Sequence, residues 1–329
     1  MEKYQPILDL KETEIAIKFV KDNFERLLSK ELNLTRVSAP LFVFPETGLN
    51  DNLNGYERAV RFDIKDIGKE VEIVQSLAKW KRNALSKYNF DINTGLYTDM
   101  NAIRRDEELD AIHSCYVDQW DWEKIITKDE RNYRFLKSVV KKIYKVFLKT
   151  NDLVNKKYPN LHTNLPKDIT FINTKDLEKM YPNLTRKERE NKIAKEKGAC
   201  FLYQIGWPLK DGKPHDGRAA DYDDWNLNGD IILWFDTLEI GLELSSMGIR
   251  VDKDSLLKQL KYKNEEQKIN NPYCQDIINY RLPLTIGGGI GQSRICMFFL
   301  KKKHIGEVQA SAWNEKYLEE LQKENIHLL

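Results

Sequence analysis

The chain has 329 residues, of which 41% are hydrophobic and 32% are charged, and its net charge is only +2. This composition predicts a folded chain, and the near-neutral charge excludes the strongly basic surface of a bulk nucleic-acid binder. No apolar run reaches the roughly 20 residues that span a bilayer, and the polar start of the chain is unlike a secretory leader. Four cysteines without a CxxC pair argue against structural zinc. We expect a cytoplasmic location, where thiols stay reduced.

The N-terminal part of the chain predicts one long helix and then several strands. Apolar residues at three-to-four spacing indicate an amphipathic helix over residues 13–31. The segment LTRVSAPLFVF reads as a strand, and Pro40 places it at an edge or a bulge. EVEIVQSL and GLYTDMNAI are the next expected strands, with a helical AKWKRNALSKY between them. After the charged turn RRDEELD, the alternating segment IHSCYVDQWDW is expected to return as a strand.

The C-terminal part predicts a helical insertion followed by more strands. A long helix is expected over residues 130–157, and RKERENKIAKEKG forms a second one that Gly198 closes. ACFLYQIG, GDIILWFD, LELSSMGIRV and a glycine-rich strand follow, before a last apolar helix. Because most strands follow one another without helices between them, the order favours an α+β fold with an antiparallel sheet. We expect a single domain over residues 1–329, with the helical insertion at about 130–197.

The glycine-rich stretch PLTIGGGIGQSRICMFF is typical of a strand that approaches a nucleotide. It does not fit a Walker loop, because Gln292 and Ser293 follow Gly291 and no lysine is near in the sequence. It does not fit a dinucleotide fingerprint either: Gly287 and Gly289 fit the first two places, but the third is Gln292 and no βαβ unit follows. A glycine strand beneath a nucleotide remains, with charge supplied by Arg294 at the start of the next helix. The alternative is a tightly packed glycine strand beside a solvated Arg294.

Polar residues of functional types gather in three other segments. Arg104 ends a predicted strand before an acidic turn, and His113 begins the returning one. Gln119 and Asp121 lie two residues apart on that strand, so they share one face. The remaining candidates lie on the strands and the strand-to-helix junction elsewhere in the chain: Asp230, Glu243, Ser246, Arg250, Ser76 and Lys81.

Together these elements resemble the catalytic domain of class II aminoacyl-tRNA synthetases. Its pattern is an arginine before a hairpin turn, an acid before the last strand and a glycine strand with a terminal arginine. Its first motif, which forms a dimer interface, corresponds to residues 13–44 and implies a homodimer. The closer similarity is to the ammonia-dependent asparagine synthetase (aspartate–ammonia ligase) family. It is carried by QSLAKWKR, VDQWDWE, DYDDWN, LNGDI, ELSSMGIRVD and TIGGGIGQSR, and extends from about residue 12 to the end.

The resemblance implies that aspartate, ATP and ammonia give asparagine, AMP and pyrophosphate through a β-aspartyl adenylate. Arg104 would contact the α-phosphate, whereas Arg294 would contact the γ-phosphate and cover the adenine. His113 would add a nucleotide contact. Asp230 and Glu243 carry hard oxygen ligands suited to Mg²⁺, and the resemblance implies that they hold this ion.

On the amino-acid side, the resemblance implies that Asp121 pairs with the substrate ammonium group. Gln119 would bind the side chain or carboxylate of aspartate, and Ser246 and Arg250 would hold a carboxylate. Ser76 and Lys81 also match substrate-side positions. The residues expected to take part in catalysis are Asp51, Lys81, Arg104, Gln119 and Arg294.

Two acidic segments have a functional and a plain interpretation. Asp51, in LNDNLNG, would hold ammonium and take its proton, since ammonium has no lone pair for attack; otherwise it is a residue of an Asx turn. DYDDWN, residues 221–226, is expected to be an acidic loop, with a lid or a role beside the metal as the alternative.

The sequence also distinguishes between nitrogen donors and between rival functions. Glutamine-dependent amidotransferases need a nucleophilic cysteine, but the first cysteine here is Cys115 and no second domain for glutamine hydrolysis is expected. Ammonia is therefore the expected donor. The main rival is an aspartyl- or asparaginyl-tRNA synthetase-like enzyme, which normally has an anticodon-binding barrel ahead of the catalytic pattern. A second rival, a non-catalytic regulator of the same fold, would not need the charged residues above. We expect no nucleic-acid or membrane partner.

Overall fold

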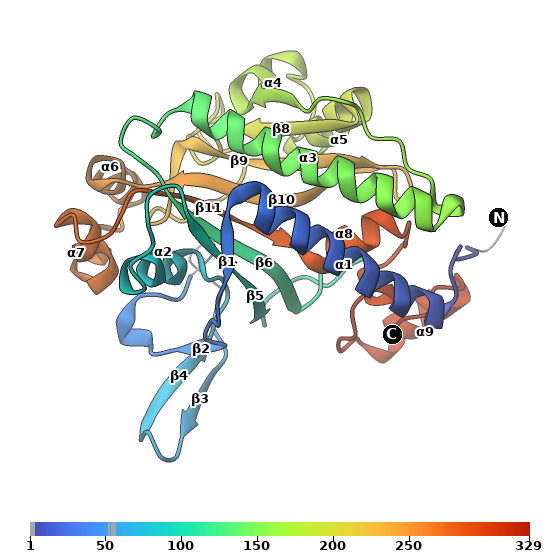
Figure 1. Cartoon of the computed structure of the whole chain (residues 1–329), viewed down its shortest axis with the longest axis horizontal. Helices are drawn as coiled ribbons and strands as arrows, with labels where there is room; N and C mark the ends of the chain where they lie inside the picture. The colour runs from blue at the N-terminus through green and yellow to red at the C-terminus, as the bar shows by residue number, and fades with distance from the viewer. Residues whose placement is uncertain (1–3, 52, 54–56) are drawn as a thin grey trace.

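An eight-stranded sheet runs through the molecule in the computed structural model, which describes residues 4–51, 53 and 57–329 (Figure 1). Its five inner pairs of strands are antiparallel, and the two outermost strands run parallel to their neighbours. In spatial order the strands are β1 (Leu34–Arg36), β5 (Gly95–Ile103), β6 (Tyr116–Ile125), β11 (Thr285–Gly291), β10 (Ile240–Arg250), β9 (Asp223–Phe235), β8 (Ala199–Tyr203) and β7 (Thr170–Asn173).

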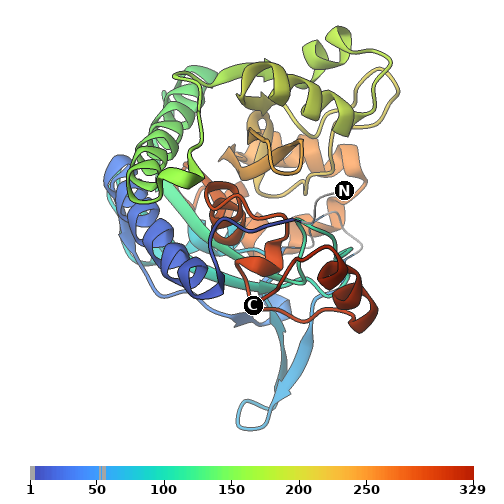
Figure 2. The ribbon, with the colours of Figure 1, turned by 90° about the vertical axis from the view of Figure 1, so that its right-hand side faces the viewer.

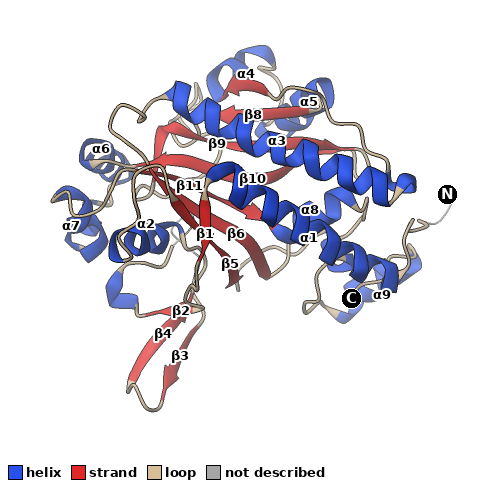
Figure 3. Ribbon diagram, in the orientation of Figure 1, coloured by secondary structure: helices blue, strands red, loops and turns tan. Residues whose placement is uncertain are grey.

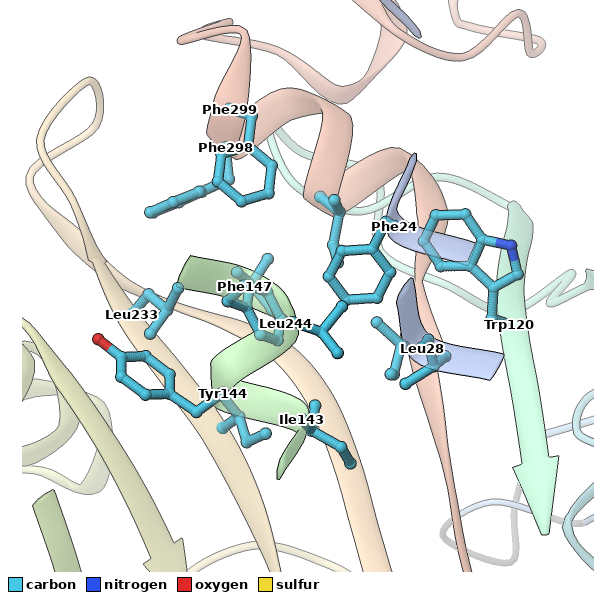
Figure 4. Close-up of a cluster of buried hydrophobic side chains, with 14 of the residues drawn as sticks. Phe24, Leu28, Trp120, Ile143, Tyr144, Phe147, Leu233, Leu244, Phe298 and Phe299 are labelled. Atoms are coloured by element: carbon cyan, nitrogen blue, oxygen red, sulfur yellow. The ribbon is translucent and has the colours of Figure 1, made fainter. Parts of the chain in front are cut away.

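Two long helices cover one face of this sheet side by side, α1 (Leu10–Leu32) and α3 (Tyr133–Lys157), together with the short α8 (Gln292–Phe299) (Figures 1 and 2). Between helices and sheet lies the main hydrophobic core, part of which is drawn in Figure 4. Phe24 of α1 stacks on Trp120 of β6 with ring centroids 5.0 Å apart. Burial of large aromatic side chains such as these contributes much of the stability of a fold.

Shorter helices lie on the other face of the sheet and around its ends; Figure 3 distinguishes helices from strands by colour. α5 (Arg186–Lys197) packs Ile193 and Ala194 against Cys200, Leu202 and Ile232, side chains that point away from the main core. On this face and around the ends of the sheet lie α2 (Ala78–Lys87), α4 (Thr174–Met180), α6 (Lys253–Lys263), α7 (Pro272–Ile278) and α9 (Glu315–Lys323). Short 3-10 turns occur at Pro45–Thr47, Pro159–Leu161, Glu266–Asn270 and Ile305–Glu307.

A second, three-stranded sheet projects from the body as an arm (Figures 1 and 2). It consists of β2 (Phe42–Val43), β4 (Lys69–Ile73) and β3 (Arg61–Ile64) in that order. An edge-on contact between Phe42 and Phe62, with ring centroids 5.4 Å apart, links its two outer strands.

The α+β class and the antiparallel character of the sheet are confirmed, as are the long helices, but several strand boundaries were wrong. LTRVSAPLFVF is not one strand: β1 and β2 belong to different sheets, because Pro40 interrupts the extended run and lacks the N–H that a ladder needs. The expected helical segment at about 130–197 also contributes β7 to the main sheet.

The two segments around His113 and residues 221–226 also differ from the expectation. IHSCYVDQWDW becomes a strand only at Tyr116, so His113 lies in the preceding turn, where Asp110 binds both its amide and its ring. DYDDWN is largely strand, because β9 begins at Asp223. In the part of the chain that the structure describes, no helix is long and apolar enough to cross a membrane.

Candidate functional site

The alternation of β6 separates the hydrophobic core from a polar face. Trp120 and Trp122 are buried in the main core, as their type predicts, whereas the intervening residues Gln119, Asp121 and Glu123 point to the opposite side. A cavity of about 420 Å³ lies on that side, over β6, β11 and β10. This volume is typical of a small-molecule site.

All predicted site residues except Asp230 line this one cavity. They come from strands, loops and helix ends that are far apart in the sequence: Asp51, Ser76, Lys81, Arg104, His113, Gln119, Asp121, Glu243, Ser246, Arg250 and Arg294. The fold therefore brings together the residues that the sequence had singled out, and their individual roles stay predictions.

The glycines of β11 leave room for polar side chains of the neighbouring strands. A Cβ at Gly287 would lie 1.9 Å from Oε2 of Glu123, and one at Gly289 would lie 2.3 Å from Oε1 of Gln119. Glycine is thus required here because the protein's own side chains pass over the strand. At the end of the strand, Gly291 lies under the side chain of Arg294, whose Cβ would be 3.4 Å from an added methyl group.

A lysine does reach the glycine strand, although none is near it in the sequence. Nζ of Lys81, on α2, donates to the carbonyl of Gly288 at 3.0 Å and to Oδ1 of Asp121 at 2.7 Å. Glu123 is also close, with Oε2 at 4.0 Å from Nζ. Burial lowers the pKa of Lys81, and the two carboxylates only partly oppose this shift. The pair places a buried lysine and a carboxylate at the floor of the cavity.

Arg250 lies beside this pair as the centre of a buried ion cluster. Its Nε and Nη2 bind the carboxylate of Glu123, with 2.7 Å between Nη2 and Oε2, and Nη1 binds Asp223. Burial raises the pKa of Glu123, but the charge and hydrogen bonds of Arg250 together with the charge of Lys81 outweigh burial, and the net shift is downward. Three of the five guanidinium N–H groups are used in this way, which leaves one on each terminal nitrogen.

Two arginines approach the cavity from its rim. Nη1 of Arg294, in the first turn of α8, donates to the carbonyl of Glu243 at 3.1 Å. Arg104 follows the end of β5, and its Nη1 is 3.9 Å from Oε2 of Glu107. Neither guanidinium has a short carboxylate contact among the described residues, so both keep donors for an anionic ligand.

A third arginine, Arg218, was missed in the sequence. It lies in the irregular segment between β8 and β9, lines the cavity and forms ion pairs with Asp216 and Asp230. Asp230 sits across from Ser246 on the neighbouring strand, beneath this arginine. The available signal was an arginine in a segment without helix or strand periodicity, directly before the acidic stretch.

Asp230 and Glu243 are the two carboxylates expected from the sequence to hold Mg²⁺, and Asp230 is also the partner of Arg218. Oδ1 of Asp230 is buried and has no hydrogen-bond partner among the described residues. Burial raises the pKa of Asp230 to about 8. The charge of Arg218 lowers this pKa, whereas the negative charges of Glu243 and Asp216 raise it further. No group of three or more metal-ligating side chains occurs in the described ranges. Two carboxylates fit Mg²⁺, which usually takes one or two from the protein and the rest from phosphates and water.

Asp51 is 2% exposed at the edge of the cavity. One of its oxygens accepts from the amide of Leu53 at 2.9 Å, which is the Asx-type contact that the plain interpretation predicts. Burial raises the pKa of its carboxyl group, and the neighbouring charges of Lys79 and Asp221 act in opposite senses. The rest of LNDNLNG lies partly outside the described residues, namely Asn52, Asn54 and Gly55.

The acidic stretch 221–226 is neither solvated nor free. Each of its three aspartates is buried against a cation from another element: Asp221 with Lys79, Asp223 with Arg250 and Asp224 with Arg131. Buried carboxylates require such partners. The expectation of an acidic loop was therefore wrong, because the stretch is paired with cations and largely strand.

Comparison with known proteins identifies the family. A model of the aspartate–ammonia ligase family matches residues 11–325. The chain belongs to the aspartate–ammonia ligase family. A ligase of this name from Fusobacterium nucleatum subsp. nucleatum is 64% identical over 326 residues, which cover 99% of each chain. Its counterpart from Ruminiclostridium cellulolyticum is 60% identical and covers 100% of this chain and 98% of its own. The protein is an enzyme of this family, as the motifs predicted.

Solved structures confirm the predicted fold. Asparaginyl-tRNA synthetase from Pyrococcus horikoshii, complexed with asparaginyl-adenylate, has a TM-score of 0.68 at 17% identity and matches 92% of this chain and 70% of its own. Aspartyl-tRNA synthetase from Entamoeba histolytica has a TM-score of 0.60 and also 17% identity, over 92% of this chain and 59% of its own. The aspartate–ammonia ligase family thus shares the fold of class II synthetase catalytic domains.

Proposed function

We propose that the enzyme makes asparagine from aspartate, ATP and ammonia through a β-aspartyl adenylate, and releases AMP and pyrophosphate. The observation that carries this proposal is family membership over nearly the whole chain, at up to 64% identity. The cavity supports it, because the arginines at its rim keep free N–H donors and its floor carries paired charges. A carboxylate is a poor electrophile, and adenylation gives it a leaving group that ammonia can displace.

Adenylation brings two anions together, so positive charge must meet the phosphates. We assign Arg104 and Arg294 to this task, because both line the cavity and retain free donors. We add Arg218, which reaches the same cavity from the loop before β9. His113 would contribute a contact at the rim, held by Asp110 through Nδ1 at 2.9 Å. Together these side chains would orient the α-phosphate toward the attacking carboxylate.

The floor of the cavity suits aspartate. The two unused N–H groups of Arg250 form a fork that would hold a carboxylate, with Ser246 beside it. Asp121 binds Lys81 with one oxygen and keeps acceptor capacity for the substrate ammonium group. Gln119, above Gly289, and Ser76, at the start of α2, would bind the side-chain end of aspartate.

We propose Mg²⁺ as the cofactor, held by Asp230 and Glu243 together with the phosphates of ATP. When bound, the ion would offset phosphate charge. Asp51 would bind ammonium and accept its proton, since its raised pKa makes it a stronger base than an exposed aspartate. The protein groups thus divide into those that hold ATP, those that hold aspartate and one that activates ammonia.

The proposal extends to a homodimer in the cytoplasm that acts without nucleic acid. α1 and the strand after it match the dimer motif of the resembling synthetases, and the net charge of +2 offers no basic surface for tRNA. Light scattering of the purified protein measures the oligomeric state, and a monomer at working concentration would contradict the dimer.

The decisive assay follows AMP and asparagine formed from aspartate, ATP and Mg²⁺. We expect asparagine with ammonium alone, little with glutamine and no change when tRNA is added. Product that appears only with tRNA would overturn the proposal in favour of an aspartyl- or asparaginyl-tRNA synthetase-like activity. Equal turnover with glutamine would overturn the choice of ammonia as the nitrogen donor.

A further inference from the structure

The loop of residues 204–222, between β8 and β9, carries Arg218 to the cavity. It has no helix or strand of its own, and an isolated bridge between Pro208 and Pro214 is its one β-type contact. A segment of this length without regular structure needs side-chain contacts to hold one conformation. α4, α6 and β9 each contribute such contacts, through Glu178, Gln259 and Trp225. Others come from α5, a helix that does not line the cavity.

Two residues of α5 bind this loop from one face of the helix. Arg186 donates through Nη2 to Asp211 at 2.7 Å and through Nε to the carbonyl of Pro214 at 2.7 Å. One turn later, Oε1 of Glu190 lies 2.9 Å from Nε2 of His215. Because Arg186 and Glu190 are four residues apart, they present their side chains on the same side of the helix. One turn of α5 therefore binds the loop at Asp211, Pro214 and His215.

The contact between His215 and Glu190 is a buried one. His215 is 4% exposed, and its Nδ1 has no hydrogen-bond partner in the described part of the chain. The bond to Glu190 is thus the single polar contact that the ring makes among these residues. Loss of this bond would leave the whole imidazole unsatisfied in the interior, a state that costs more than the bond itself contributes.

Arg218 follows His215 by three residues, which limits its backbone to about 10 Å from that of His215. Its side chain is 12% exposed and forms ion pairs with Asp216 and Asp230. Asp230 of β9 thus holds the guanidinium, whereas Lys263 of α6, which donates to the carbonyl of Arg218 at 3.3 Å, and the contacts of the loop with α5 hold the backbone.

We propose that Arg186, Glu190 and His215 are positioning residues that hold Arg218 at the phosphate side of the cavity. The inference rests on the proposed function for the role of Arg218, but not for the geometry of the loop. It assigns a task to α5, in the segment between β7 and β8: through its contacts with the loop, the helix helps to position Arg218.

The test compares His215→Ala with His215→Gln, whose amide nitrogen can replace Nε2 as the donor to Glu190. We expect His215→Ala to raise the KM for ATP at least tenfold in ATP–pyrophosphate exchange, and His215→Gln to restore most of the loss. In an Arg218→Ala background, His215→Ala should cause little further loss, because both act through one guanidinium. Lys192→Gln, at an exposed position of α5, is the matched control and should behave like the parent.

Hydrogen exchange of the unliganded protein separates this inference from the proposed function. We expect His215→Ala to raise exchange at least tenfold in residues 204–222 while the amides of β9 and β10 stay protected. Unchanged exchange in the loop, or fully additive losses in the double variant, would overturn the inference even if asparagine is made. A parent enzyme that makes no asparagine would overturn the proposed function instead, and the exchange result would still decide whether α5 holds the loop.

Discussion

The carboxylate of Asp118, on β6, caps a helix that belongs to another part of the chain. Its Oδ1 accepts from the amide of Ser293 at 3.0 Å, in the first turn of α8, where the N-cap residue Gly291 offers no side chain. Its Oδ2 receives Nζ of Lys21, from α1, at 2.9 Å. One aspartate therefore links the long helix on the core face to the turn that presents Arg294.

This link predicts a combined loss of stability and of nucleotide binding. Asp118→Ala removes the cap of α8 and leaves Lys21 without its partner, so the free energy of unfolding should fall by about 2–3 kcal/mol. The KM for ATP should rise, because Arg294 lies in the uncapped turn. Asp118→Asn keeps an oxygen for the amide of Ser293 and should lose less in both measurements. Urea denaturation and pyrophosphate exchange provide the values; equal losses in the two variants would contradict capping.

Arg294→Ala should slow adenylation strongly while the fold persists. Removal of a guanidinium that faces transition-state charge typically costs a factor of 100 or more, on the order of 3 kcal/mol. The measurement is the rate of ATP–pyrophosphate exchange at saturating aspartate. Arg281→Ala, which removes an exposed arginine paired with Asp276, is the control and should keep the parent rate. Unchanged exchange in Arg294→Ala would refute the assignment.

Asp51→Asn should impair the use of ammonium more than the formation of the adenylate. The amide cannot accept a proton, so asparagine formation at neutral pH should drop by roughly 100-fold. Pyrophosphate exchange, which needs no ammonia, should change far less. The deficit should shrink at alkaline pH, where free ammonia is abundant. A constant deficit across this pH range would exclude Asp51 as the proton acceptor.

Gly287→Ala tests why β11 is rich in glycine. The new Cβ would overlap Oε2 of Glu123 at 1.9 Å and approach Nη2 of Arg250 at 2.7 Å. Separation of this buried pair should lower the free energy of unfolding by about 3–5 kcal/mol. Gly291→Ala, where the nearest atom is 3.4 Å from the new Cβ, should cost much less. Similar denaturation midpoints for both variants would contradict the steric explanation.

His304 predicts how stability depends on pH outside the cavity. Burial lowers its pKa from 6.5 to about 4, with Nδ1 accepting from the amide of Gly306 at 3.0 Å. Between pH 6.5 and about 4, the imidazole of His304 is therefore protonated in the unfolded chain but neutral in the folded one. The contribution of His304 to stability is complete above pH 6.5 and declines as the pH falls toward 4. The loss of stability over this interval should be smaller in His304→Asn, and an identical pH profile would contradict the assignment.

Strand alternation made much of the site predictable. A period of two put Gln119 and Asp121 on one face and Trp120 between them in the core, and the structure agrees. Residue type and order were sufficient for Arg104 and Arg294, because both stand where a strand meets a turn or a helix. These features depend on local chain geometry, which the sequence encodes directly.

Contacts between distant segments were not predictable in the same way. Arg218 lies in a loop without periodicity, and its place depends on α5 and β9. The burial of the aspartates of residues 221–226 was not predicted, because their partners, such as Lys79 and Arg131, are about 90 to 140 positions away in the chain. Charge pairing across such separations is decided by tertiary packing.

The short outer strands of the main sheet have a consequence for behaviour at high concentration. β1 has three residues and β7 has four, and each runs parallel to its single neighbour. An exposed sheet edge offers unpaired backbone groups to which strands of other molecules can add. Edges this short offer few unpaired groups. The eight-stranded sheet therefore has little tendency to add strands of other molecules and to form fibres.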